Sequence, residues 1–165
     1  MFHKTSRLLI TLSCLLLISL LAACNRKTEF EELKRMTTTK NGRYYFDVLV
    51  SNPPDSMEVL KRQMADYYNQ RNMEVRKGGK GRCISSIRFY KKTRCTAYFI
   101  DHDEDPGGWS SYELDFCDAE IGFVSPNRPG DPDPQGTCLL ILYDKNGDEA
   151  FRGNLRMDAE NNIVP

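Results

Sequence analysis

Only one segment of the chain carries a clear helical pattern, and it stands between runs that have strand patterns. Its apolar side chains recur at spacings of three and four, which is typical of a helix with one buried face. They are Met57, Leu60, Met64, Tyr67 and Tyr68. Asp55 stands three residues before Glu58, which is a capping-box spacing. A single amphipathic helix must cover another element, and the flanking pattern indicates a sheet.

The strand patterns lie on both sides of this helix. Residues 43–51 place apolar side chains at alternate positions, and Asn52-Pro53-Pro54 ends the run. Further runs occupy 82–90, 94–101, 111–117, 137–144 and 149–157. We expect a hairpin about Lys92 between the first two of these runs and another about Asn146-Gly147 between the last two. The order predicts an α+β domain over residues 43–165, with one main helix packed on an antiparallel sheet of about five to six strands.

The N-terminal residues have the pattern of a targeting segment and not that of this domain. Lys4 and Arg7 precede an apolar stretch from Leu8 to Ala23. As a helix this stretch would extend about 24 Å, which is shorter than the roughly 30 Å hydrocarbon core of a membrane. We therefore interpret residues 1–23 as a signal peptide. An ordinary secretory signal or a short membrane anchor is the alternative.

The end of this segment, Leu21-Ala22-Ala23-Cys24, resembles the lipobox of bacterial lipoproteins. The resemblance covers only the leader, and it implies that Cys24 is acylated and becomes the first residue of the mature chain. Two or three acyl chains, including palmitate-type ones, would anchor the protein stably without a spanning helix. Asn25 is not the aspartate that favours inner-membrane retention in enterobacterial lipoproteins. We expect an outer-membrane protein that faces the periplasm, with surface display left open.

The charge balance argues against a nucleic-acid partner. The chain has 23 basic and 23 acidic side chains. Removal of residues 1–23 leaves 21 basic and 23 acidic side chains among 142 residues, a net charge of −2. A phosphate-backbone binder needs a strongly basic surface. Residues 24–42 are polar, with Phe30, Leu33 and Met36 three residues apart, and suggest a tether with a possible short helix.

Four cysteines remain after the leader and Cys24 are set aside: Cys83, Cys95, Cys117 and Cys138. An even number in an exported domain favours disulfides, and three pairings of four cysteines are possible. Free buried cysteines are the alternative. No paired C-x-x-C spacing of a structural zinc site occurs, so we expect no metal centre of that kind.

The most distinctive polar stretch is the acidic loop that begins at Asp101, Asp103 and Asp105. Alternate carboxylates resemble the start of a calcium loop, but Pro106 stands where an EF-hand needs glycine. We therefore expect a solvated acidic loop, with a Ca²⁺ site as the alternative, and no other cofactor. Trp109, the only tryptophan, is a candidate contact for a partner, together with these three aspartates. The proline-rich loop at 126–136 is a second candidate recognition segment.

Catalysis has few candidates. His3 leaves with the leader, so any histidine chemistry must use His102. No nucleophile elbow, zinc-protease or P-loop motif occurs. We therefore expect a lipid-anchored cell-envelope protein that binds a protein partner, of the general layout of immunity proteins or assembly accessories, and assign no catalytic residue. The alternative is a small envelope hydrolase that uses carboxylates or His102.

Overall fold

The computed structural model describes residues 27–33, 38–40, 42–79, 81–101, 117, 119–127 and 136–164. Several residues singled out above lie outside these ranges. They are Cys24, His102, Asp103, Asp105 and Trp109, together with the leader, most of the predicted strand at 111–117 and most of the loop at 126–136.

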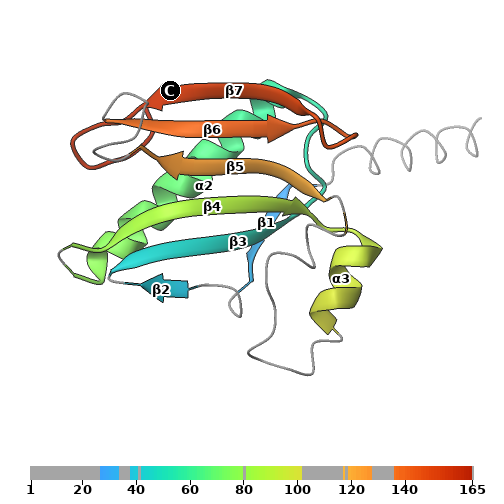
Figure 1. Ribbon diagram of the computed structural model, residues 1–165, viewed down its shortest axis with the longest axis horizontal. Coiled ribbons are helices and arrows are strands. Elements are labelled where there is room, and N and C mark those ends of the chain that lie inside the picture. The colour runs from blue at the N-terminus through green and yellow to red at the C-terminus, as the bar shows by residue number, and fades with distance from the viewer. Residues whose placement is uncertain are drawn as a thin grey trace, which may run out of the picture.

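The described residues form one sheet of seven strands with one long helix across one of its faces (Figure 1). The sheet order is β1-β3-β4-β5-β6-β7, and β2 also pairs with β3. The strands are β1 (Glu29–Glu32), β2 (Thr38–Lys40), β3 (Arg43–Ser51), β4 (Cys83–Lys91), β5 (Glu120–Pro126), β6 (Thr137–Tyr143) and β7 (Glu149–Arg156). The helices are α2 (Met57–Lys77) and α3 (Arg94–Asp101). The predicted α+β class with one main helix on a sheet is confirmed.

The sheet is mixed rather than antiparallel, because β3 and β4 are parallel. Their register runs from Arg43 opposite Cys83 to Val50 opposite Lys91. Parallel strands cannot be joined by a tight turn and need a crossover, which α2 supplies here. All the other strand pairs are antiparallel. The prediction of a purely antiparallel sheet is therefore wrong at this one pair.

The hairpin expected about Lys92 is also wrong, since residues 94–101 form α3. The reason is local: Thr93 and Thr96 form a reciprocal cap at the helix start. The Thr93 amide donates to Oγ1 of Thr96 at 2.8 Å, and the Thr96 amide donates to Oγ1 of Thr93 at 3.2 Å. These bonds satisfy amides that a first helical turn leaves without partners. The antiparallel partner of β4 is instead β5, a strand that was not predicted from the sequence.

The segment expected to be a tether contributes two strands instead of a short helix. In β1, Phe30 faces the core, stacks on Tyr67 with ring centroids 5.1 Å apart, and meets Phe89 edge-on. The chain just before β1 is hydrogen-bonded to Asn52, because Oγ1 of Thr28 donates to the backbone carbonyl of Asn52 at 3.0 Å. Residues 28–33 therefore belong to the folded domain.

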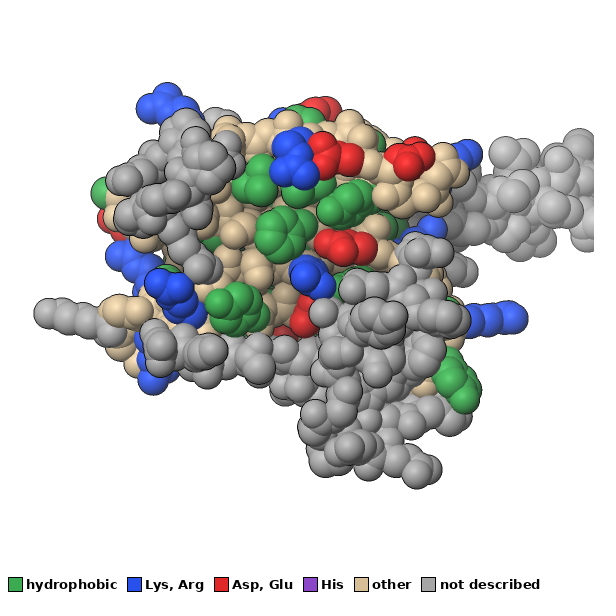
Figure 2. Space-filling view, viewed as in Figure 1, with side chains coloured by type: hydrophobic (Ala, Val, Ile, Leu, Met, Phe, Trp, Pro, Cys, Tyr) green, Lys and Arg blue, Asp and Glu red, His purple; other side chains and the backbone are tan. Residues whose placement is uncertain are grey.

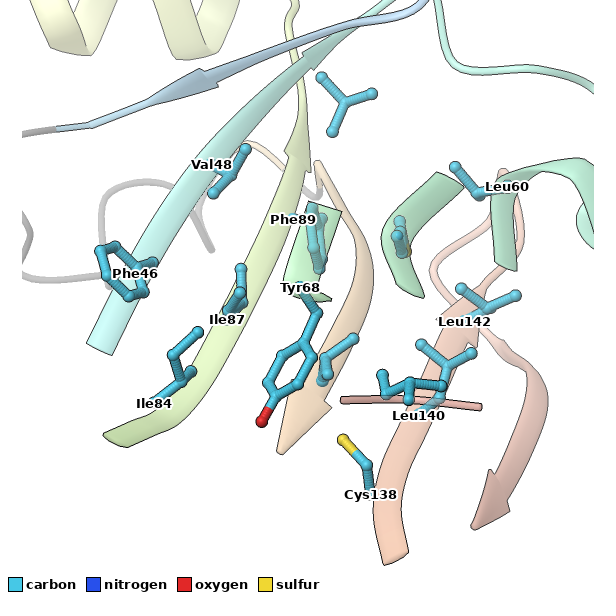
Figure 3. Packing of buried hydrophobic residues seen from close by; sticks show 14 of the residues in the cluster. Phe46, Val48, Leu60, Tyr68, Ile84, Ile87, Phe89, Cys138, Leu140 and Leu142 are labelled. Atoms are coloured by element: carbon cyan, nitrogen blue, oxygen red, sulfur yellow. The ribbon is translucent and has the colours of Figure 1, made fainter. Parts of the chain in front are cut away.

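The core lies between α2 and the sheet (Figure 3). The predicted stripe is confirmed, since Leu60, Met64 and Tyr68 are buried, and the stripe continues through Asn72 and Val75. Tyr68 reaches across β5 toward Cys138 of β6. The expected capping box does not form: the residue before the helix is Ser56, and no side chain caps it.

The predicted turn between the last two strands is confirmed. The Asp144 amide donates to the Asp148 carbonyl at 2.9 Å. Gly147 has a φ of 82°, a conformation that glycine adopts at no steric cost. The Asp144 carboxylate accepts from the Asn146 amide at 2.8 Å.

Candidate binding surface on the open face of the sheet

The residues predicted to bind a partner are only partly within the described chain. Asp101 is exposed at the last residue of α3. One disulfide joins Cys95, on α3, to Cys117, shortly before β5. This bridge spans 22 residues, so it closes the segment that carries the acidic loop and Trp109. Of the other two predicted disulfide cysteines, Cys83 is free and exposed and Cys138 is free and buried.

Cys138 is a buried core residue, and its burial makes the thiol unreactive. Its side chain is fully enclosed between the sheet and α2. That burial raises the pKa of the Cys138 thiol to about 12, while a hydrogen bond with the Ser125 backbone opposes the rise. A thiol with so high a pKa is not a thiolate at neutral pH, and the thiolate is the nucleophile in cysteine chemistry.

The most extended surface feature is the face of the sheet opposite α2, which we call the open face. Because strand side chains alternate between faces, the register places one row of side chains across it. The central row is Asp47, Arg88, Phe123, Ile141 and Arg152, on five successive strands. Figure 2 shows hydrophobic side chains in the middle of this face with acidic and basic side chains around them.

Two flanking rows complete the open face. On one side of the central row, Leu139 stands between Ser125 and Asn154. On the other side, Tyr143 of β6 is paired with Glu149 of β7, while Glu120 of β5 is paired with Tyr90. One corner is already covered: Leu33, Leu49 and Tyr90 form a small buried cluster. The apolar side chains of Phe123, Leu139 and Tyr143 are half-buried and remain partly exposed.

The charges on this face are concentrated around Tyr143. Its pKa is raised, first by partial burial and then by Glu120 and Glu149, while Arg152 and Arg88 oppose the rise. Arg152 also binds Glu149 in a forked contact, with Nη2 to Oε2 at 2.6 Å and Nε to both carboxylate oxygens at 3.0 Å. This contact lowers the pKa of Glu149. A planar guanidinium held by a carboxylate keeps a fixed orientation, which suits a recognition surface.

This composition resembles the composition of known protein interfaces. Aromatic residues and arginine are enriched at the centres of such interfaces, and charged groups lie at their rims. The open face has Phe123 and Arg88 in its central row, Tyr143 in a flanking row, and the Glu149–Arg152 pair at the edge strand. On binding, the half-buried aromatic side chains would supply contact area, and the surrounding charges would supply orientation.

The sequence reading did not identify these residues, although a signal was present. In β6 the run Thr137–Tyr143 is apolar at nearly every position rather than at alternate ones. A strand of that kind has apolar side chains on both faces. Because α2 covers only one face, the other set lies on the open face, where Ile141 is buried by its neighbours and Leu139 stays partly exposed.

Among the described residues, no three or more histidine, cysteine or acidic side chains come together as metal ligands would. None of the described helices is both long and apolar enough to cross a membrane. The chain matches no known family model, and no curated protein or solved structure shows significant similarity to it.

Proposed function

We propose that this chain is a lipid-anchored binding module of the bacterial cell envelope that holds a protein partner on the open face of its sheet. The observation that carries the proposal is the group of partly exposed apolar side chains on that face, Phe123, Leu139 and Tyr143. Masking a toxin, or assisting envelope assembly, is the kind of role that such a module fills.

The anchoring part of the proposal rests on the lipobox at Leu21-Ala22-Ala23-Cys24. Only two residues separate Cys24 from Lys27, the first described residue, and a chain of this length spans at most about 10 Å. An acylated Cys24 would therefore hold the domain close to the membrane, in our proposal the periplasmic face of the outer membrane. The sheet would present its open face sideways from that anchor.

The partner is expected to be a protein with an apolar or aromatic patch bordered by charge. A complementary partner would place apolar atoms over Phe123 and Leu139, where water is displaced on binding. Its charged groups would border that apolar patch, opposite the charged side chains around Tyr143. Such a pattern sets orientation and association rate more than it sets affinity.

The test is photo-crosslinking in the native cell with a benzoyl-phenylalanine probe in the full chain. We expect a discrete protein adduct from a probe at Phe123. The matched control is a probe at Met73, an apolar side chain that is 52% exposed on α2, the helix that covers the opposite face of the sheet. Equal adducts from both positions, or none from Phe123, would refute the open face as the binding surface.

Two substitutions separate binding from anchoring. Leu139→Glu should weaken capture of the crosslinked partner at least tenfold, because it places a charge in the apolar centre, whereas Met73→Glu should leave capture within about twofold. Cys24→Ala should release the protein from the membrane fraction without changing partner affinity in detergent extracts. Retention of Cys24→Ala in the membrane would refute the anchor alone.

A further inference from the structure

An open cavity, which we call the helix-end cavity, lies where β1, β3 and the C-terminal half of α2 meet. Figure 1 shows the start of β3 beside the C-terminal end of α2. Its charged and aromatic lining residues are Glu32, Tyr44, Phe46, Arg71, Glu74 and Arg82. The volume is about 290 Å³, near the lower end of the range for small-molecule sites. The helix-end cavity is therefore large enough for one ring-sized ligand, or for one unit of a longer chain.

Two aromatic rings of β3 contribute to the lining. Tyr44 and Phe46 stack with ring centroids 6.0 Å apart and an angle of 11° between their planes. The guanidinium of Arg71 lies over the Phe46 ring, 4.7 Å from its centroid, so a cation already occupies that ring. Phe46 is buried, whereas Tyr44 stays partly exposed. The ring of Tyr44 is therefore the aromatic surface that a ligand can reach.

Arg71 is held in place by two carboxylates. Its Nη2 lies 2.6 Å from Oε2 of Glu32, and its Nη1 is paired with Glu74. Glu74 is 42% exposed, so its carboxylate keeps acceptor positions for a further donor. Because these contacts fix the polar groups before a ligand arrives, less freedom is lost when the ligand binds.

Arg82 supplies hydrogen-bond donors at the end of α2. A Cβ on Gly78 would stand 2.5 Å from Nη1 of Arg82 and 3.3 Å from its Cδ. The missing side chain of Gly78 thus lets Arg82 lie close against the end of the helix. A guanidinium donates through up to five N–H groups and accepts none. The helix-end cavity therefore offers donors from Arg82 and acceptors from Glu74.

The charges of the lining balance, and this restricts the kind of ligand. The charged lining residues are two glutamates and two arginines. A charged ligand would meet both signs, whereas an uncharged ligand with several hydroxyl groups can use the donors and the acceptors together. The weakly positive C–H groups on one face of a sugar ring also match the negative face of an aromatic ring.

We propose that the helix-end cavity binds one uncharged pyranose ring of an oligosaccharide. The sugar ring lies against Tyr44, and its hydroxyl groups form hydrogen bonds with Glu74 and Arg82. This site is on the side of the sheet that α2 covers, so it does not depend on the binding function assigned to the open face.

The test is isothermal titration calorimetry of the full chain in a detergent without a sugar headgroup. The probes are two uncharged trisaccharides, maltotriose and the trimer of N-acetylglucosamine. We expect saturable binding of at least one of them, and a preference for the second would indicate a contact to its acetamido group. Tyr44→Ala should weaken binding about tenfold, because it removes the stacking surface, whereas Tyr44→Phe keeps the ring and should bind within about twofold. The matched control is Tyr98→Ala, at a tyrosine that is 57% exposed on α3, which should also bind within about twofold.

A second variant separates a loss of binding from a loss of folding at Tyr44. Arg82 is exposed, so Arg82→Gln should leave the fold intact and weaken binding about fivefold through lost hydrogen bonds. Arg94→Gln, at an exposed arginine on α3, is its control and should bind within about twofold.

The balanced charges give an independent readout that needs no variant. The affinity for an uncharged trisaccharide should not fall as salt is added, and trigalacturonate, an anionic trisaccharide, should bind no more tightly. No saturable binding of either uncharged probe would overturn the proposal. Equal losses from Tyr44→Ala and Tyr98→Ala, or much tighter binding of trigalacturonate, would also overturn it.

Discussion

The contact between Gly122 of β5 and Met64 of α2 allows a sharp test of how the helix sits on the sheet. Met64 is fully buried, and its side chain lies directly over Gly122. A Cβ added at Gly122 would stand 2.7 Å from Sδ of Met64, 2.8 Å from Cε and 3.2 Å from the Ile141 carbonyl oxygen. Real Cβ atoms do not approach sulfur or carbon so closely, so Gly122→Ala must displace a buried side chain.

The expected energies follow from this geometry. Gly122→Ala should destabilise the fold by about 1–3 kcal/mol, because overpacking a dense core forces strained side chains. Met64→Ala should cost about 2–5 kcal/mol, because it leaves a cavity between α2 and the sheet. In the double variant the added methyl enters the space vacated by Met64. Its cost there should fall to about zero, which gives a coupling energy of about 1–3 kcal/mol.

The assay is urea unfolding of the four proteins of this cycle, followed by circular dichroism. With a slope of about 2 kcal/mol per molar urea, a change of 2 kcal/mol moves the midpoint by about 1 M, which is readily measured. The control is Gly153→Ala, whose Cβ would meet Phe151 and not Met64. Its effect should add to that of Met64→Ala. Additive energies for Gly122 and Met64 would refute the packing described here.

Two further predictions concern the periphery of the domain. Reduction of the Cys95–Cys117 disulfide should lower the free energy of unfolding by about 3 kcal/mol, since the bridge closes a 22-residue separation, and a Cys95→Ser, Cys117→Ser variant should reproduce the loss in thermal unfolding. An unchanged midpoint would contradict a constraining role. The pKa of Asp158 is lowered, chiefly by hydrogen bonds from the backbone and side chain of Asn162. The ionised Asp158 carboxylate therefore stabilises the fold above pH 3.8, the ordinary pKa of this group. This stabilisation is lost as the pH falls through the lowered pKa. The difference in melting temperature between the unaltered chain and Asp158→Ala should therefore be largest near pH 7 and shrink below pH 4, and a pH-independent difference would rule out this linkage.

The parts of the fold that could be predicted from the sequence are those with a strong local period. The stripe of α2 repeats over several turns, β3 has apolar side chains at every second position from Tyr44 to Val50, and Asn146-Gly147 indicates a turn by itself. The parallel pairing of β3 and β4 depends on where α2 returns the chain to the sheet. No short window of the sequence contains that information. A strand followed by a 21-residue helix and another strand is nevertheless the usual order for a parallel pair.

The segments that were predicted wrongly are short and have ambiguous sequence patterns. Residues 94–101 are apolar at alternate positions and also at helical spacing, and the deciding signal was the Thr93–Thr96 cap. The sequence of β1 is nearly all acidic. This is compatible with an edge strand of four residues, in which Phe30 alone has to face the core. The open face was missed for a different reason: whether an apolar residue is covered depends on which face α2 occupies, and that is a property of the whole fold.

The attachment of β1 to β3 also has a mechanical consequence. A force that pulls residue 27 away from the domain along the axis of β1 acts along the strands, since β1 enters the sheet at the Ser51 end and runs antiparallel to β3. Hydrogen bonds between antiparallel strands are perpendicular to that direction, so the four paired positions share the load instead of opening one after another. The bond from Thr28 to Asn52 and the ring of Phe30 between Tyr67 and Phe89 add to that resistance. The N-terminal strand is thus attached to the sheet in a shear geometry for a pull in that direction.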